Sequence, residues 1–168
     1  MGKGMISKEE ALHLVERTSK YQHALIVSAI MRKFAQRLGE DEDSWELVGL
    51  LHDLDLDLVQ EDMAKHGVVA SEMLEHKLPP ESLYAIRSHD YRTGFQPKSR
   101  LDIALIIADT LERIIDRVPI RRELSVQRLK EEVERISGDR PWYKANLGKV
   151  KELGLQTDEV LRLGIESV

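Results

Sequence analysis

The segment from Ser99 to Val118 constrains the fold more than any other part of the sequence. Apolar residues recur in it at the three- and four-residue spacing of a helix, and these are Ile103, Ile106, Ile107, Ile114 and Ile115. Pro119 directly follows and would end the helix. The rest of the chain has no alternating strand pattern. We therefore predict an all-α protein with this helix at the centre of its core.

Capping residues, apolar spacing and prolines mark the other expected helices. These helices run from Ser7 to about Thr18, Tyr21 to Leu38, about Asp43 through His52, His66 to His76, Glu81 to Asp90, Glu123 to Ser137, and Thr157 to Glu166. Gly39 supplies the stop of the second helix, and Gly49 leaves room for another helix to approach the third closely. We interpret Tyr91–Pro97 as a turn and Pro141–Tyr143 as the anchor of a loop.

Composition excludes several classes of protein. The chain has 168 residues without a repeat or a linker composition, which indicates one domain. It has no cysteine, which excludes disulfides, thiolate zinc sites and cysteine nucleophiles. It lacks a signal-peptide core and an apolar run of the roughly 20 residues that a membrane helix needs, so we expect a soluble cytoplasmic protein without a membrane partner. The net charge of -5, from 25 basic and 30 acidic residues, argues against binding to a nucleic-acid polymer.

Potential metal-binding side chains fall on the expected inward faces of the helices. They are four histidines and two aspartates, His23, His52, Asp53, His66, His89 and Asp109. Taken one at a time, each histidine is more often a hydrogen-bonded core residue, and Asp109 can pair with Arg113 one turn later. Taken together, imidazoles and carboxylates on buried faces favour a metal centre that holds Fe, Mn, Co, Ni or Zn rather than calcium.

The order of these residues resembles the HD superfamily of metal-dependent phosphohydrolases, specifically its HDIG-type branch of small predicted hydrolases. The segments that carry the likeness most clearly are Leu50–Asp55, Lys65–Gly67 and Ile86–His89. The resemblance implies an all-α, single-domain helical bundle of the HD-domain type, with a metal site in the helical core. It also implies a metal-binding core over about 20–118 and a helical C-terminal extension over about 119–168.

The resemblance assigns a role to each of the six residues. It implies that His23, His52, Asp53 and Asp109 hold a first divalent ion, and that His66 and His89 hold a second ion that Asp53 bridges to the first. The sequence departs from the branch at Asp55, which stands where the glycine of a His-Asp-Ile-Gly motif would be. Asp55 and Asp57 can orient metal ligands, although a solvated acidic helix end is the commoner role, and we rank both below the six.

The resemblance further implies an enzyme that cleaves a phosphate ester or anhydride of a small nucleotide-like substrate. Two cations about 4 Å apart would position a hydroxide as the nucleophile and stabilise the attacking and leaving oxygens. His52 and Asp53 are the expected catalytic pair, with Asp53 able to receive a proton. The candidates for binding the substrate phosphate are Arg113, which is our first choice, and then Lys65, Arg87 and Arg92.

Three alternatives to a dinuclear hydrolase stay open. The first is a mononuclear nucleotidase in which His66 and His89 contact the phosphate, and the second is a metal-stabilised regulatory domain that binds a nucleotide without turnover. The third is an oxygenase with a diiron version of the same ligand set. Exposed apolar residues such as Leu161 and Ile165 would support a homodimer.

Overall fold

The computed structural model describes residues 5–168, and the regular structure of these residues is entirely helical, which confirms the all-α prediction. The α-helices are α1 (Lys8–Val15), α2 (Tyr21–Leu38), α3 (Glu42–Leu51), α4 (Leu56–Val59), α5 (Val68–Met73), α6 (Pro80–Ser88), α7 (Arg100–Ile115), α8 (Val126–Ser137), α9 (Trp142–Leu147) and α10 (Thr157–Ile165). Short 3-10 helices lie between them and are η1 (Met63–Lys65), η2 (Tyr91–Thr93), η3 (Arg121–Glu123) and η4 (Gly148–Leu153).

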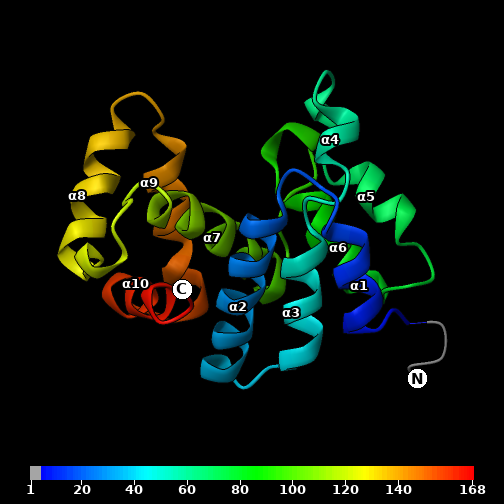
Figure 1. Cartoon of the computed structure of the whole chain (residues 1–168), viewed down its shortest axis with the longest axis horizontal. Coiled ribbons are helices and arrows are strands. Elements are labelled where there is room, and N and C mark those ends of the chain that lie inside the picture. Colours follow the sequence, from blue (N-terminus) through cyan, green and yellow to red (C-terminus); the bar gives the residue numbers. More distant parts are fainter. Residues whose placement is uncertain (1–4) are drawn as a thin grey trace.

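Helix α7 is the centre of the core, as its isoleucine pattern predicts (Figure 1). It packs against α2, α3 and α6 and, with its other faces, against α8, α9 and α10. Ser99 begins the helix in a capping box, because its hydroxyl accepts a hydrogen bond from the Asp102 amide while the Asp102 carboxylate accepts one from the Ser99 amide. The helix thereby links the part of the fold built from α2, α3 and α6 to the C-terminal helices.

Helices α2 and α3 lie side by side, and Gly49 sets how closely they approach (Figure 1). A Cβ atom at position 49 would lie only 2.9 Å from the Ser28 Cα atom and 3.0 Å from the Val27 carbonyl oxygen. Gly39, with a φ of 73°, ends α2 and turns the chain back toward α3, as expected. The start of α2 and the end of α3 therefore lie at the same end of the pair.

Replacement of Gly49 by alanine is expected to destabilise the protein by about 1–3 kcal/mol, because the added methyl group would press against the α2 backbone. Helix propensity alone would give the opposite sign, since alanine is the better helix former. The measurement is urea unfolding followed by circular dichroism.

Gly138→Ala is the matched control for this prediction. Gly138 has helical backbone angles, and no neighbouring atom among residues 5–168 would lie within 4 Å of the added methyl group. The control should therefore be neutral or slightly stabilising. A Gly49→Ala protein as stable as the Gly138→Ala protein would contradict this account of the packing.

Several expected helix boundaries are wrong. The helix expected from His66 begins only at Val68, because Gly67 adopts a φ of 96° that breaks regular helix, and His66 itself has extended backbone. The expected first helix ends at Val15 rather than near Thr18, and α8 begins at Val126 rather than at Glu123. The sequence patterns missed α4, α9 and η4 altogether. Short helices contain too few turns for an apolar period to be recognised.

Two expectations about exposed apolar surface are also tested by the fold. Leu161 is fully buried rather than exposed, and Ile165 is partly covered. Both residues pack within or against the main core, so α10 does not offer the apolar face on which the homodimer expectation depended. Among residues 5–168, no helix combines the length and the apolar character needed to cross a membrane.

Candidate metal centre

The six predicted metal-binding residues come from separate elements and meet in the interior. His23 lies in the first turn of α2, His52 is the C-cap of α3, and Asp53 follows it. His66 precedes α5, His89 is the C-cap of α6, and Asp109 lies in the middle of α7. All of them are buried except Asp109, which is partly exposed. The packing of five elements therefore produces one polar cluster inside an apolar core.

Each of the four imidazoles is held through its Nδ1 atom by an acceptor outside the cluster. His52 donates to the Gly49 carbonyl oxygen over 2.7 Å, and His89 donates to the Ile86 carbonyl oxygen over 2.6 Å. His66 donates to the Asp55 carboxylate over 2.8 Å, and His23 donates to the Glu112 carboxylate. These contacts assign the first proton of every ring to Nδ1. All four Nε2 atoms are then directed inward and are available for a metal ion or a second proton.

Asp53 divides its two carboxylate oxygens between two groups of histidines. Its Oδ2 atom lies 3.3 Å from His52 Nε2 and 3.4 Å from His23 Nε2. Its Oδ1 atom lies 2.9 Å from His66 Nε2 and 3.5 Å from His89 Nε2. Asp53 is thus a member of both groups.

The ligand atoms of each group are close enough to surround one ion. His23, His52, Asp53 and Asp109 form the first group, and Asp53, His66 and His89 form the second; within each group the ligand atoms lie within 4.8 Å of one another. Asp109 Oδ1 completes the first group at 2.8 Å from His23 Nε2 and 3.3 Å from His52 Nε2. In the second group the Nε2 atoms of His66 and His89 are 3.2 Å apart.

The cluster strongly favours positive charge. Burial lowers the pKa of His52, but the carboxylates of Asp53 and Asp109 outweigh burial and raise it to about 10. Burial likewise lowers the pKa of His66, and Asp53 and Asp55 raise it to about 9. Burial raises the pKa of Asp53, yet the charge of His52 and its contact with that ring hold the carboxyl pKa well below its usual range. The carboxylates thus stay ionised and stabilise a positive charge among the imidazoles, carried either by protons or by a metal ion.

A divalent ion in each group fits these residues. Both oxygens of Asp53 are fully buried, and neither accepts a well-formed hydrogen bond from the residues that the structure describes. Unprotonated Nε2 atoms only 3.2 or 3.3 Å apart repel each other unless positive charge lies between them. Nitrogen and oxygen ligands of this kind suit Fe, Mn, Co, Ni or Zn. The chemistry of the donor set therefore fits a metal centre.

Two carboxylates outside the cluster orient its histidines. Asp55 is fully buried, and besides holding His66 it accepts hydrogen bonds from the amides of Gly67 and Ala70 at 2.7 and 2.9 Å. The expectation that Asp55 lies at a solvated helix end is therefore wrong. Asp57 does lie at the surface, where it accepts a hydrogen bond from the Ser19 amide. Sequence reasoning missed Glu112, although its position three residues after Asp109 places both on one face of α7.

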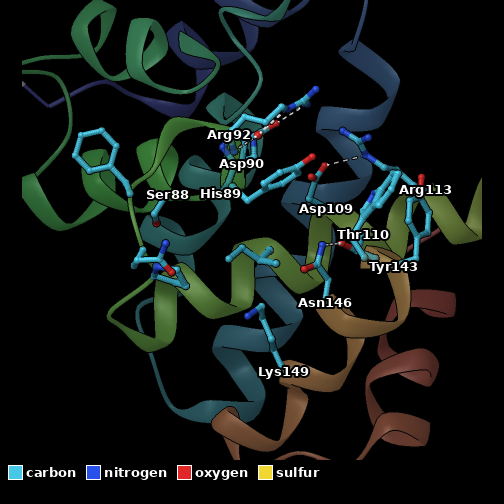
Figure 2. Close-up of a pocket in the computed structure, with 16 residues that line it drawn as sticks. Ser88, His89, Asp90, Arg92, Asp109, Thr110, Arg113, Tyr143, Asn146 and Lys149 are labelled. Carbon is cyan, nitrogen blue, oxygen red and sulfur yellow. Dashed lines mark hydrogen bonds and ion pairs between the residues drawn. The ribbon is translucent and has the colours of Figure 1, made fainter. Parts of the chain in front are cut away.

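A cavity of about 230 Å³ opens beside the cluster, and His89 and Asp109 form part of its wall (Figure 2). Two of the four predicted phosphate-binding residues line it, namely Arg113 and Arg92. Arg113 also pairs with Asp109 over 3.5 Å, so the sequence expectation of this ion pair is confirmed. The cavity therefore joins the cluster to solvent along a wall that carries positive charge.

The other two predicted phosphate-binding residues do not line this cavity. Lys65 is exposed and lies 3.7 Å from the Asp62 carboxylate. Arg87 lies over the rings of Tyr84 and Phe95, at 5.7 and 5.6 Å from their centroids. Closeness to a histidine in the sequence did not bring either cation to the cavity. Arg87 lies two residues before His89 on α6, so the two side chains point in different directions, and Lys65 ends η1 just before the extended backbone of His66.

The structure adds cavity residues that the sequence patterns did not indicate. Trp142, Tyr143, Asn146 and Lys149 line it from α9 and η4. The interpretation of Pro141–Tyr143 as a loop anchor is therefore wrong, since Trp142 and Tyr143 begin a helix. The spacing of residues 142, 143, 146 and 149 is typical of one face of a helix and could have indicated these residues. A pattern that covers only two turns is weak evidence for a helix by itself.

Comparison with known proteins identifies a family. The family model of the HD domain matches residues 21–114. This region begins at the first residue of α2 and ends near the end of α7, so it contains all six residues of the cluster. It leaves α8, α9 and α10 outside. No curated protein and no solved structure matches the chain.

Proposed function

Because the chain belongs to the HD superfamily of metal-dependent phosphohydrolases, we propose that it hydrolyses a phosphate ester or anhydride of a small nucleotide-like substrate and uses two divalent transition-metal ions. The observation that carries this proposal is the position of Asp53, whose two oxygens face different groups of histidines. A carboxylate in that position can bridge two ions, which a structural ion pair would not require. The HDIG-type resemblance agrees with this assignment.

The proposed ligands follow from the two groups. His23, His52, Asp53 and Asp109 would hold the first ion, and His66, His89 and the other oxygen of Asp53 would hold the second. When bound, such ions supply a water of lowered pKa and stabilise the charge that develops on the phosphate oxygens. Glu112 and Asp55 keep His23 and His66 in the tautomer that a metal ligand needs.

The position of the cavity supports an approach of the phosphate from the side of Asp109. Asp109 is the member of the cluster that is partly exposed, and Arg113 lies beside it at the cavity wall. We expect Arg113 to bind a non-bridging phosphate oxygen and to orient the ester for reaction at the cluster. Arg92 is less available, because Asp90 binds its guanidinium through both carboxylate oxygens at 3.0 and 2.8 Å. The leaving group would extend into the cavity.

The rim of the cavity favours a substrate with a planar ring. Tyr91, Phe95 and Trp142 all line it, and they are the aromatic residues among the large apolar side chains exposed in the described part of the chain. Tyr91 and Phe95 come from the segment after α6, whereas Trp142 begins α9. Exposed aromatic side chains gathered from two distant segments can stack on a nucleobase.

The test combines metal analysis with a phosphate-release screen. Purified protein is analysed for bound metal and then assayed with nucleotides and dinucleotides in the presence of Mn, Fe, Co, Ni, Zn or Mg. Two ions per chain with turnover are expected, while one ion with turnover would instead select the mononuclear nucleotidase. Ligand-induced stabilisation without phosphate release under any metal would overturn the proposal in favour of a regulatory domain.

A further inference from the structure

Two helical stripes that pack against each other form adjoining walls of the cavity. Ile106, Asp109, Thr110 and Arg113 line it from α7, and Trp142, Tyr143, Asn146 and Lys149 line it from α9 and η4. The stripes run in opposite directions, because Tyr143 lies beside Arg113 whereas Asn146 Nδ2 donates to Thr110 Oγ1 over 3.1 Å. If this antiparallel pairing continues along the two stripes, Lys149 lies near Ile106. Figure 2 shows Lys149 on the side of Asn146 away from Arg113.

Lys149 differs from the other cations of the cavity in its partners. Arg113 has Asp109 as a partner and Arg92 has Asp90, each within 3.5 Å. Among residues 5–168, no carboxylate lies within the 4.0 Å ion-pair distance of Lys149. Its side chain is nonetheless partly buried in the cavity wall. A partly buried ammonium group without a counter-charge is available to an anion that enters from solvent.

Lys149 and Arg113 lie toward opposite ends of the α7 stripe. Ile106 and Arg113 are seven residues apart on α7, which corresponds to about 10 Å along the helix axis. Asp109 of the metal cluster lies between them. A phosphate held at the cluster by Arg113 would therefore leave Lys149 free to bind a different group of the same molecule.

We infer that Lys149 is a specificity-determining residue that binds a second anionic group of the substrate, so that the preferred substrate carries two separated anionic groups. This inference deepens the proposed function and rests on it for the position of the first phosphate. Lys149 and its neighbours Asn146 and Trp142 lie outside the family match at 21–114, so this wall of the cavity is contributed by the chain's own C-terminal segment.

The experiment compares three nucleotides that differ in the number and spacing of their phosphates. They are a nucleoside 5′-monophosphate, the 5′-diphosphate and the 3′,5′-bisphosphate of the same nucleoside. Both kcat/KM for phosphate release and the Kd from calorimetry are measured with wild-type protein, Lys149→Ala and Lys149→Arg. Lys151→Ala is the matched control, because Lys151 is an exposed lysine of the same 3-10 helix that does not line the cavity.

The wild type is expected to prefer the bisphosphate over both other nucleotides. Lys149→Ala should reduce kcat/KM for the bisphosphate by about 10- to 100-fold, the size expected for losing a charge-assisted hydrogen bond, and should reduce kcat/KM for the monophosphate by a much smaller factor. Lys149→Arg should restore most of the preference, and Lys151→Ala should match the wild type.

The two readouts separate failure of the inference from failure of the proposed function. Phosphate release with the same bisphosphate preference in Lys149→Ala would overturn the inference and leave the function standing. Tighter, Lys149-dependent binding of the bisphosphate without phosphate release would support the inference and overturn the hydrolase assignment. Equal binding of all three nucleotides by the wild type would overturn the inference.

Discussion

The Asp53→Asn protein is expected to lose both metal ions and to release phosphate on the order of 10³-fold more slowly than the wild type, because Asp53 belongs to both ligand groups. Its Oδ2 atom faces His23 and His52, and its Oδ1 atom faces His66. Asparagine keeps the size of the side chain but removes the negative charge. It also turns an amide NH₂ group toward one set of Nε2 atoms. An amide nitrogen is not a metal ligand, so the bridge cannot form.

Metal content and turnover are measured on the same preparation. Asp57→Asn is the matched control, since it makes the same chemical change four residues later, at a surface carboxylate held by Ser19. His66→Ala gives a second comparison, because His66 belongs to one group only and its loss should remove one ion rather than two. Full metal content and normal turnover in Asp53→Asn would rule out the bridging role.

Asp55→Asn is expected to weaken the affinity of the protein for the second ion by about 10- to 100-fold and to lower the free energy of unfolding by about 1–3 kcal/mol. In the wild type one carboxylate oxygen of Asp55 accepts a hydrogen bond from His66 Nδ1, and the other accepts hydrogen bonds from the amides of Gly67 and Ala70. An asparagine that keeps the two backbone hydrogen bonds presents NH₂ to His66 Nδ1. That ring must then carry its proton on Nε2, which can no longer bind a metal ion.

The measurements are metal titration and urea unfolding of the metal-free protein. Asp57→Asn again serves as the control, with unchanged metal affinity and nearly unchanged stability. The first ion should bind normally to Asp55→Asn, because His23 is held by Glu112 and His52 by the Gly49 carbonyl. An equal loss of affinity for both ions would show that Asp55 acts through the fold as a whole rather than through His66.

The sequence predicted the parts of the site that depend on helix periodicity. His23 shares a stripe with buried residues of α2, and Asp109 lies among the isoleucines of α7, so both were expected to face inward. The apolar spacing predicts a helix that begins at His66, and the structure has no helix at that position, yet His66 still enters the cluster. Its position depends on the turn at Gly67 and on Asp55, neither of which follows from periodicity.

The cations of the site illustrate the limit of arguments from neighbours in the chain. Lys65 stands beside a cluster histidine and points to solvent, whereas Lys149 is 60 residues beyond His89 and lines the cavity. Only the antiparallel packing of α9 and η4 along α7 brings Lys149 there. No local pattern encodes that packing.

Side-chain patterns along the chain are sufficient to predict the helical class, the central place of α7, the start and stop of α2, and the set of six residues that form the cluster. These features follow from side-chain spacing and capping, which act over a few residues. The folded structure was needed to show how the oxygens of Asp53 are shared, that Glu112 and Asp55 orient the imidazoles, and which cations face the cavity. These features depend on ångström-scale contacts between elements distant in the sequence, and the same helical pattern is compatible with many packings of the helices.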